Sequence, residues 1–299
     1  MRAIVYESHG DPEVLHLADV PDPQAGPGQV RVRVEAAAVN GWDVKSRAGV
    51  TGAPEPATPV VPGLEVAGVV DALGDGVTGV APGDRVVGFA VGGGYAELAL
   101  TKVFARVPDG LAVTDAVTLP VAAETATRVL RLLDLRAGET LLVHGASGAV
   151  GALATQLAVR RGARVVGTAS ARNQDRVAAL GATATTYGAG LVERVRALAP
   201  DGVDAVLDTT GAGVLPDSIA LRGGTDRIVT IADDAAADLG VTASYRSERD
   251  ADELAQAVDA LARGDLTTTV GAVLPLADAA RAHALVESGH PGGKVVLVP

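Results

Sequence analysis

The sequence predicts an α/β protein in which a β-rich domain accompanies a domain built on a parallel sheet. The chain has 299 residues, 48% of them hydrophobic and 20% charged, which is enough for two packed domains. Up to about residue 115, Gly and Pro separate short alternating runs. From residue 121 onward, short apolar runs alternate with segments of helical spacing, which is typical of right-handed βαβ units.

The first part contains three expected strands. The run QVRVRVEAAAV at 29–39 alternates Val with Arg and Glu, the period of a half-buried strand. Two further strands are expected at 63–74 and 83–93, because turn signals bound them: GDG at 74–76 and PGD at 82–84. This pattern indicates a β-rich, irregular domain.

The second part is expected to alternate strands with helices. Strands are expected at 140–144, 163–170, 204–210, 227–232 and 241–246, and helices at 121–135, 149–162, 173–181 and 250–264. The last segment, 272–299, is expected to hold one helix and a terminal strand.

Composition excludes several classes of function. The net charge is −11, which disfavours nucleic acids and anionic membranes, and aromatic residues at 2% leave few stacking platforms for bases. The absence of cysteine excludes disulfides, thiol nucleophiles and Cys-based metal sites. No N-terminal run resembles a signal peptide, and no apolar run reaches about 18 residues. The sequence therefore predicts no nucleic-acid or membrane partner and a cytoplasmic location.

The stretch VHGASGAVGA at 143–152 follows a predicted strand and opens a predicted helix. Its Gly145, Gly148 and Gly151 match the dinucleotide-binding fingerprint. In that fingerprint Gly145 permits a tight turn, Gly148 lets the backbone approach a pyrophosphate, and Gly151 lets the helix pack closely on the sheet. A glycine-rich turn without a ligand is the alternative.

The same stretch offers backbone donors for phosphate. The N–H groups from Ser147 through Gly148 and Ala149 to Val150 are expected to point at phosphate oxygens, whose negative charge the helix dipole favours. A dinucleotide pyrophosphate is the predicted occupant.

The second strand of this unit indicates which cofactor binds. Sites that prefer NAD end this strand with Asp or Glu, about 20 residues past the glycines, to bind the ribose 2′-hydroxyl. Position 170 here is Ser170, and Arg172 and Arg176 follow it. A carboxylate would repel a 2′-phosphate, whereas Ser and Arg would hold it, so the sequence favours NADP(H). A solvated helix start is the alternative for both arginines.

With these features in place, the chain resembles the medium-chain dehydrogenase/reductase superfamily, and more narrowly its zinc-free quinone oxidoreductase (zeta-crystallin-like) branch. The resemblance runs from end to end. It rests on these motifs, in this order: MRAIVYESHGDPEVL, VRVEAAAVNGWDVKSRAG, VPGLEVAGVVDALGDGVTGVAPGDRVVG, LPVAAETATRVL, GETLLVHGASGAVGALATQLA, LGA, and PLADAARAH through GGKVVLV.

The resemblance implies the domain organisation. Residues 1–118 with 266–299 would form a GroES-like β-barrel domain that binds the substrate. Residues 119–265 would form a Rossmann domain, a doubly wound parallel sheet that binds NADP(H). The resemblance also implies an active site in the cleft between the two domains, and a homodimer joined through edge strands of the nucleotide domains.

The sequence departs from the zinc-dependent relatives at the metal site. Those relatives supply a Cys where this chain has Asn40 and a His where it has Leu64, and the four cysteines of their structural zinc lobe are missing. Glu65 and Asp43 remain, but two carboxylates without His or Cys make a poor zinc site. We therefore expect no metal and no zinc-assisted alcohol oxidation.

The resemblance also implies the site residues. The candidates for catalysis are Asn40, Lys45 and Tyr95. The candidates for cofactor binding are Asn40, Thr125, Gly145, Ser147, Gly148, Ala149, Val150, Gly151, Ser170, Arg172, Tyr187, Asp208, Ile231 and Lys294. Tyr187 corresponds to a position that contacts the 2′-phosphate, and Ile231 to one near the nicotinamide ring.

Several of these candidates have a plainer alternative. Asn40 can be a turn residue before a glycine, Lys45 a member of an exposed loop ion pair, and Lys294 a surface lysine. Asp208 can cap the turn that follows its strand. Trp42, like Tyr95, is a candidate wall of the substrate pocket, with a place in the core as its alternative. Two histidines, His144 and His283, are interpreted as hydrogen-bonded structural residues rather than catalysts.

Without zinc, a hydride from NADPH still adds to an electron-poor carbon when the charge moves to a distant oxygen. The sequence therefore predicts a reductase of quinones or α,β-unsaturated carbonyls. An enoyl reductase of a biosynthetic pathway, such as polyketide synthesis, is the second hypothesis. A non-catalytic protein that binds or senses NADPH is a third hypothesis, from another class.

Overall fold

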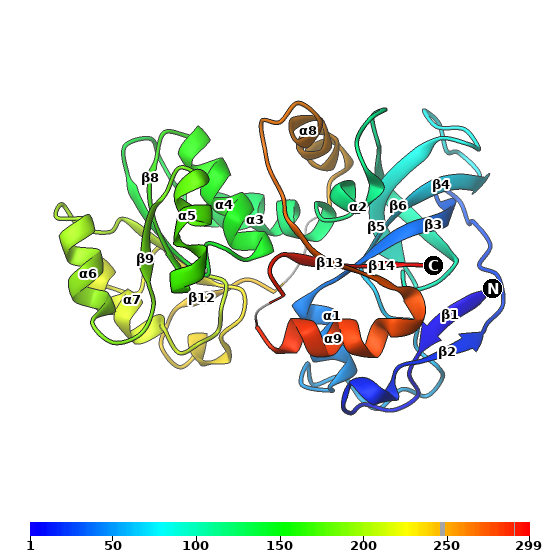
Figure 1. Cartoon of the computed structure of the whole chain (residues 1–299), viewed down its shortest axis with the longest axis horizontal. Coiled ribbons are helices and arrows are strands. Elements are labelled where there is room, and N and C mark those ends of the chain that lie inside the picture. Colours follow the sequence, from blue (N-terminus) through cyan, green and yellow to red (C-terminus); the bar gives the residue numbers. More distant parts are fainter. Residues whose placement is uncertain (246–248, 290) are drawn as a thin grey trace. The chain divides into compact units, whose positions relative to one another are not determined.

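A computed structural model describes residues 1–245, 249–289 and 291–299 (Figure 1). Its contacts divide the chain into two units, Met1–Val121 with Arg249–Pro299 and Ala122–Glu248. The first unit is called the β unit below and the second the nucleotide unit. No helix in the described ranges is long and apolar enough to cross a membrane.

The β unit is built on a six-stranded sheet in the order β13-β14-β3-β4-β5-β6. An additional pairing of β3 with β6 closes four of these strands into a barrel. The strands of the unit are β1 (Arg2–Val5), β2 (His16–Asp19), β3 (Val30–Val39), β4 (Glu65–Leu73), β5 (Arg85–Val91), β6 (Leu98–Arg106), β13 (Val270–Pro275) and β14 (Lys294–Val298). Its helices are η1 (Pro12–Val14), α1 (Gly41–Arg47), α2 (Val113–Ala116), α8 (Ala251–Ala262), η4 (Leu276–Asp278) and α9 (Ala279–Glu287).

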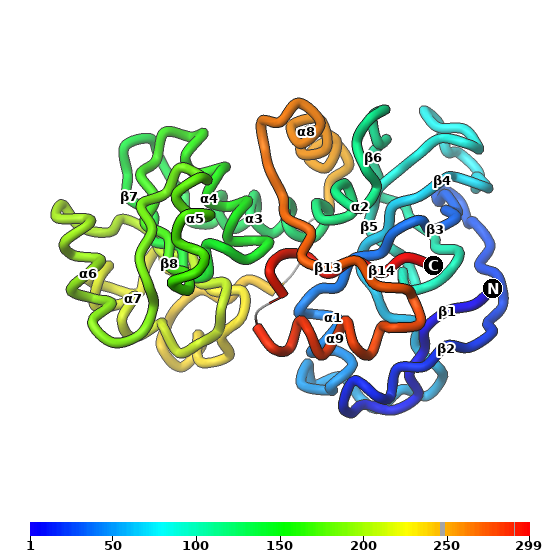
Figure 2. Tube along the Cα trace, in the orientation of Figure 1, coloured from blue at the N-terminus to red at the C-terminus, as the bar shows by residue number. Residues whose placement is uncertain are grey.

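The C-terminal strand completes this sheet. β14 pairs antiparallel with β3, in a register that sets Val295 opposite Val39 and Leu297 opposite Ala37. Figure 2 shows the red C-terminal segment running beside the blue strands of the N-terminal part. The pairing brings Lys294, the first residue of β14, next to Asn40, the first residue after β3.

The nucleotide unit contains a six-stranded parallel sheet in the order β12-β11-β10-β7-β8-β9. Its strands are β7 (Thr140–His144), β8 (Arg164–Ala169), β9 (Thr183–Thr186), β10 (Ala205–Asp208), β11 (Ile228–Thr230) and β12 (Thr242–Ala243). Its helices are α4 (Ala149–Arg160), η2 (Ala171–Asn173), α5 (Gln174–Ala179), α6 (Leu191–Leu198), α7 (Leu215–Arg222) and η3 (Asp234–Ala236), and most of α3 (Pro120–Leu132) belongs here as well.

The strand order reverses between β7 and β10, which is the point where doubly wound sheets bind ligands beyond the carboxyl ends of their strands. His144 and Asp208, the last residues of these two strands, lie opposite each other in the register. The predicted fold class, a β-barrel domain with a doubly wound parallel sheet, is confirmed.

Helix α8 was expected in the nucleotide domain, whose predicted range ran to residue 265. The contacts instead group it with the β unit, because α8 packs on β6. Its buried Leu254 and Val258 supply the apolar face, and the Arg249 guanidinium before it lies 4.9 Å from the centre of the Phe89 ring. An amphipathic pattern predicts a helix but not the sheet it covers.

Most predicted elements are present, and the strand at 140–144 has the predicted bounds. The strand predicted at 241–246 shortens to two residues, and its last position lies outside the described residues. Strand β13 was not predicted; its residues are mostly half-buried and exposed in alternation, at the edge of the sheet.

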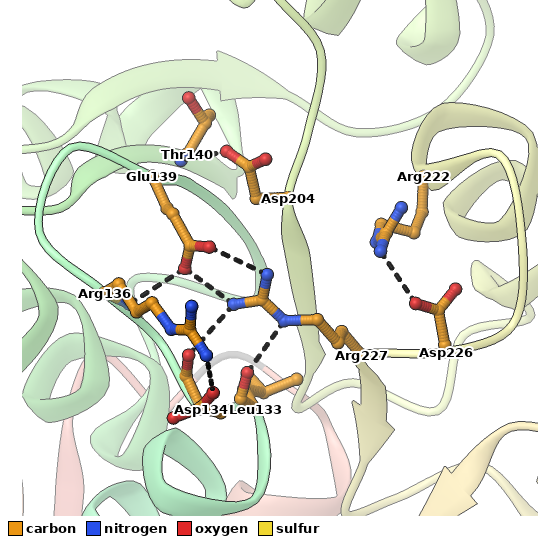
Figure 3. A network of polar contacts seen from close by, with 9 residues as sticks. All are labelled: Leu133, Asp134, Arg136, Glu139, Thr140, Asp204, Arg222, Asp226 and Arg227. Atoms are coloured by element: carbon orange, nitrogen blue, oxygen red, sulfur yellow. Dashed lines mark hydrogen bonds and ion pairs between the residues drawn. The ribbon is translucent and has the colours of Figure 1, made fainter.

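One arginine, Arg227, links the start of β11 to the segment at 133–139 between α3 and β7, at the amino-terminal edge of the nucleotide unit's sheet (Figure 3). Arg227, at the start of β11, donates to both carboxylate oxygens of Glu139, at 2.9 and 2.6 Å. The same guanidinium donates to the carbonyls of Leu133 and Asp134, at 2.9 and 3.1 Å. Bidentate pairs of this kind are the stronger class of ion pair. The hydrogen bonds of Arg227 hold the pKa of Glu139 down, at about 2.

We predict that Glu139→Gln lowers the free energy of unfolding by about 1 to 2 kcal/mol at pH 7, after allowance for partial exposure. The lowered pKa means that the contribution of Glu139 is present above pH 4.5, its unfolded value, and is lost as the pH falls through about 2. The gap between wild type and variant should therefore close over this window in urea unfolding curves. The exposed pair of Arg136 with Asp134 provides the control, since Asp134→Asn should change little; a constant gap would contradict the assignment.

Candidate active site

Five buried polar side chains meet in the β unit, and we call them the buried polar cluster: Asn40, Asp43, Glu65, Tyr95 and Lys294. Asn40 caps α1 and Asp43 lies in its first turn. Glu65 begins β4, Lys294 begins β14, and Tyr95 lies in the loop before β6. Residues far apart in the sequence are thus brought to one place by the barrel and its C-terminal strand.

An ion pair forms the centre of the cluster. The Lys294 Nζ lies 2.6 Å from Glu65 Oε1 and also donates to Asn40 Oδ1. Asn40 Nδ2 donates to the same Glu65 oxygen, at 3.0 Å. The other oxygen, Glu65 Oε2, accepts the Val121 N–H at 2.7 Å. Each charge is therefore paired and hydrogen-bonded, the condition under which buried ions are tolerated.

The second carboxyl group of the cluster, Asp43, accepts hydrogen bonds from neutral donors only among the described residues. Asp43 Oδ2 accepts the Asn40 N–H at 2.8 Å and the Tyr95 hydroxyl at 3.3 Å. Burial, and to a lesser degree the nearby Glu65 carboxylate, raises the pKa of Asp43 to about 7. Burial also raises the pKa of Tyr95 well above its ordinary range.

The ring of Tyr95 requires a glycine beside it. Gly63 has a φ of +102°, and a Cβ at this position would lie 2.5 Å from Tyr95 Cδ1. The His283 ring meets the Tyr95 ring edge-on, with 5.8 Å between centroids. The phenol is thus held rigidly against Asp43.

The structure decides several alternatives in this unit. Lys294 is only 5% exposed, so the interpretation as a surface lysine is wrong. Trp42 is 46% exposed, so a place in the core is wrong for it. Tyr95 is fully buried, which does not fit a wall of a substrate pocket. Lys45 is half-buried on helix α1 rather than in an exposed loop.

His144 and His283 are less completely hydrogen-bonded than expected. His144 Nε2 lies 3.0 Å from Ser218 Oγ, but its Nδ1 has no hydrogen-bond partner in the described parts of the chain. Neither ring nitrogen of His283 has one there. Burial lowers the pKa of both residues to about 4. Both are structural, as expected, but they are kept neutral by burial rather than by complete hydrogen bonding.

In the nucleotide unit, the glycine turn has the geometry expected of a phosphate cradle. Gly145 has a φ of +79°, and a Cβ there would lie 2.5 Å from Thr209 Oγ1. A Cβ on Gly151 would lie 2.2 Å from the Gly145 carbonyl oxygen, so α4 packs tightly on the turn. At Gly148 a Cβ would meet only that carbonyl within 4 Å, at 3.3 Å, so the backbone here is open to a ligand.

One of the expected phosphate donors is used within the turn. The Gly148 N–H donates to the Gly145 carbonyl at 2.9 Å, so the expectation that it points at a phosphate oxygen is wrong. Helix α4 begins at Ala149 with glycine as its N-cap and no side-chain cap. The N–H groups of Ala149, Val150 and Gly151, in its first turn, have no acceptor within the helix and suit an anion.

The carboxyl end of β8 lies close to this turn. Asn173 Nδ2 donates to Ser147 Oγ at 3.4 Å, which joins the η2 turn to the glycine turn. Ser170 Oγ is buried and has no hydrogen-bond partner among the residues that the structure describes. An unpaired buried hydroxyl is costly unless a ligand completes it. Arg172 is exposed. Asn173 was not among the predicted site residues, because the only signal for it in the sequence is an asparagine at a turn.

Asp208 organises the carboxyl ends of β10 and β11. Its carboxylate accepts the Thr210 hydroxyl and N–H at 2.7 and 2.9 Å and the Thr230 hydroxyl at 2.7 Å. Its carbonyl accepts the Ile231 N–H at 3.0 Å. The Gly211 N–H lies 3.3 Å from the carboxylate. Asp208 therefore caps the turn that follows its strand.

Thr125 lies on α3 beside a buried ion pair. Its hydroxyl donates to Glu124 at 3.2 Å, and Arg128 pairs with Glu124 at 2.7 Å. Arg128 also donates to Ser244 Oγ and, at 3.3 Å, to its carbonyl, which fastens α3 to the segment after β12. Glu124 and Arg128 were not predicted, although their spacing of four residues on a helix is typical of an ion pair.

These residues fit a dinucleotide. The open backbone at Gly148, the first turn of α4 and the unpaired Ser170 hydroxyl together form a cradle of donors for phosphate and ribose. No group of three or more His, Cys, Asp or Glu side chains that could hold a metal ion occurs within the described part of the chain.

Comparison with known proteins agrees with this geometry. Residues 26–109 match the family model of the alcohol dehydrogenase GroES-like domain, and residues 180–297 match that of zinc-binding dehydrogenases. A rat (Rattus norvegicus) quinone oxidoreductase is 31% identical over 322 aligned positions, which cover 100% of this chain and 98% of the relative. The pikromycin polyketide synthase component PikAII of Streptomyces venezuelae is 40% identical over 224 positions, which cover 68% of this chain and 6% of that protein.

Two solved structures are similar over their whole length. A protein described as an NAD-dependent alcohol dehydrogenase has a TM-score of 0.88 and 33% identity, with 100% of both chains covered. A mycobacterial protein solved in complex with NADPH has a TM-score of 0.87 and 32% identity, again with 100% of both chains covered.

We predict that Asp43→Asn flattens the pH dependence of stability between pH 4 and 8. With a pKa of about 7 when folded and 3.8 when unfolded, Asp43 holds a proton that unfolding releases. Its contribution is present below pH 3.8 and lost as the pH rises through about 7. Asn mimics the protonated acid, so the variant should gain stability relative to wild type as the pH rises from 5 to 8.

Urea unfolding at several pH values measures this difference. The exposed Asp75 supplies the matched control, since Asp75→Asn should keep the wild-type slope. Parallel curves for Asp43→Asn and wild type would show that Asp43 is ionised throughout, and would contradict the prediction.

Proposed function

The chain belongs to the quinone oxidoreductase branch of the medium-chain dehydrogenase/reductase superfamily, and on this premise we propose that it is a zinc-independent reductase that transfers hydride from NADPH to a quinone or an α,β-unsaturated carbonyl. It is an enzyme of the quinone oxidoreductase type, with a nicotinamide cofactor and a small-molecule substrate. The preference for NADPH, the acceptor, the independence from zinc and the residue roles below are the proposal.

The observation that carries the proposal is the Lys294–Glu65 ion pair. Its ammonium lies between Glu65 and Asn40, in the part of the fold where zinc-dependent relatives would use the position of Asn40. A divalent cation would have to displace this ammonium. Acceptors that do not need a strong Lewis acid suit such a site, because quinones and enones carry the developing charge on their own oxygen.

Two residues support NADPH over NADH. Ser170 stands where a carboxylate would bind the ribose of NAD, and its unpaired hydroxyl is ready to donate. Arg172 follows it and is exposed, so its guanidinium is accessible to a phosphate. Similar structures include both an NAD-dependent enzyme and an NADPH complex, so these residues, rather than the fold, support the choice.

The bound cofactor supplies the hydride, and the chain positions it. We assign the pyrophosphate to the glycine turn and the first turn of α4, with Ser147, Gly148, Ala149 and Val150 as its neighbours. Asp208 holds the turn at 209–211 and, through its carbonyl, Ile231, so it acts as a positioning residue. Thr125 and Tyr187 are further cofactor residues in the proposal.

The roles in the β unit follow from burial. Asn40 has both ends of its amide engaged, by Lys294 and by Glu65, so its orientation is fixed. We assign Tyr95 and Lys294 to positioning rather than to direct contact with substrate or cofactor, because both are buried and hydrogen-bonded. Lys45 remains a candidate for contact with the substrate.

A second candidate acceptor is an enoyl thioester. The 40% identity with a polyketide synthase component favours it, and it is itself an α,β-unsaturated carbonyl compound. The same hydride chemistry would then serve a biosynthetic pathway.

We also propose a homodimer, since β12 and β9 are the edge strands of the parallel sheet and are available to extend it. Analytical ultracentrifugation at micromolar concentration tests the homodimer, and a single monomeric species would contradict it. We propose the cytoplasm as the site of action.

The function is tested by NADPH oxidation with three acceptors: 1,4-benzoquinone, a simple enone and a 2-enoyl thioester of N-acetylcysteamine. Oxidation of NADPH that persists after chelator treatment supports the proposal, and preference for the thioester supports the biosynthetic version. Tight binding of NADPH with no oxidation by any acceptor would contradict the proposal.

We predict that Arg172→Ala weakens NADPH binding by about 1.5 to 3 kcal/mol, as for a lost charged hydrogen bond, and leaves NADH almost unchanged. Titration calorimetry with both cofactors measures this. Arg161→Ala removes the same charge at the far end of α4 and is the control. Equal losses for both cofactors would remove the basis for the NADPH assignment.

A further inference from the structure

The ends of β8 and β9 lie side by side at the carboxyl edge of the parallel sheet. Their register pairs Ala169 with Thr186, so the next residues, Ser170 and Tyr187, continue from neighbouring strands about 4.8 Å apart. Tyr187 is 55% exposed, so a ligand can reach its side chain. Ser170 brings an unpaired hydroxyl to the same edge.

A side chain from the following helix organises the turn that carries Tyr187. Arg194, on α6, donates from Nη1 to the Ala189 carbonyl at 2.7 Å and from Nη2 to the Thr186 carbonyl at 2.9 Å. The carbonyls of Gly188 and Tyr187 lie 3.4 and 3.5 Å from Nη2. One guanidinium therefore gathers the carbonyls of all four residues from 186 to 189.

Besides the Arg194 side chain, a backbone hydrogen bond holds this turn, from the Leu191 N–H to the Gly188 carbonyl at 3.1 Å. Gly188 and Gly190 have φ angles of +87° and +74°, and glycine leaves many other conformations accessible to such a turn. Residues 187–190 are all exposed, so packing does not restrict them. Because the C=O and N–H of a trans peptide point in opposite directions, drawing the carbonyls to Arg194 turns the N–H groups of 187–190 away from it. Such a row of N–H groups favours an anion.

We propose that Arg194 is a positioning residue that sets the preference for NADPH: it holds the turn at 186–190 so that Tyr187, beside Ser170, meets the 2′-phosphate of the adenosine. The proposal rests on the proposed function, since NADPH is assigned there. Arg194 itself does not touch the phosphate, because its guanidinium is occupied by carbonyls of the turn. On the β8 side, Gln174 acts in the same way, with Nε2 donating to the carbonyls of Ala169, Ser170 and Thr185 at 2.9, 3.1 and 3.2 Å.

The test compares Arg194→Met, which keeps the aliphatic stem, with Arg196→Met, which removes an exposed charge from the same helix. The probes are 2′,5′-ADP and 5′-AMP, which differ in the 2′-phosphate, and then NADPH and NADH. We expect Arg194→Met to raise the Kd of the two 2′-phosphate ligands about tenfold, as for one lost hydrogen bond from Tyr187 to the charged phosphate, and to leave the other two within about twofold. Arg196→Met should change none of them.

Hydrogen exchange supplies a readout independent of activity. The amides of residues 187–190 should exchange faster in Arg194→Met and at the wild-type rate in Arg196→Met. Tyr187→Phe should weaken the 2′-phosphate ligands without changing exchange. If Arg194→Met does not fold, Arg194→Lys, which keeps the charge but not the fork, replaces it.

Three results would overturn the proposal. They are equal weakening of ligands with and without the 2′-phosphate, no weakening by Arg194→Met, and no effect of Tyr187→Phe. A wild-type protein that binds 2′,5′-ADP no better than 5′-AMP would overturn the NADPH assignment itself, before any variant is made.

Discussion

The antiparallel pairing of β14 with β3 is the constraint on which the polar site of the β unit depends. It places Lys294 beside Asn40 and within 2.6 Å of Glu65. Without β14, Glu65 would be a buried carboxylate without a counter-ion. Removing one partner of a buried ion pair lowers the free energy of unfolding by about 3–5 kcal/mol. The C-terminal strand therefore completes both the sheet and the charge balance of the site beneath it. A truncation that removes β14 acts on both at once.

The nucleotide unit must keep hydrogen-bond donors available for a ligand that binds reversibly. At the carboxyl edge of its sheet, acceptor side chains bind backbone and hydroxyl donors, and donor side chains bind backbone carbonyls. Asp208 is an acceptor and collects N–H and hydroxyl donors after β10 and β11. Gln174 and Arg194 are donors and collect carbonyls after β8 and β9. With the loops fixed in this way, the donors of the α4 turn and the Ser170 hydroxyl are left for the ligand.

Local signals predicted much of this molecule. The strand at 140–144 and the three glycines after it could be located because a buried strand, a left-handed turn and a helix start each leave a mark within a few residues. The Lys294–Glu65 pair left no such mark, since it joins opposite ends of the chain through a register that no local pattern encodes. The same holds for His283, whose burial against Tyr95 depends on how α9 packs. Arg194 resembled any helical arginine, because its partners are backbone carbonyls rather than acidic side chains.

The buried polar cluster contains two carboxyl groups and, among its five members, one cation. Lys294 contacts Glu65, whereas Asp43 contacts only neutral donors, the Asn40 N–H and the Tyr95 hydroxyl. In a medium of low polarity an unpaired negative charge is costly. Asp43, with a pKa of about 7, therefore keeps its proton below that pH, and the cluster as a whole is then neutral. A dication added to this neutral set would leave it with excess positive charge unless Lys294 departed and Asp43 ionised. The Lys294 ammonium and the Asp43 proton together thus neutralise the two carboxyl groups, whose negative charge a metal ion would otherwise balance.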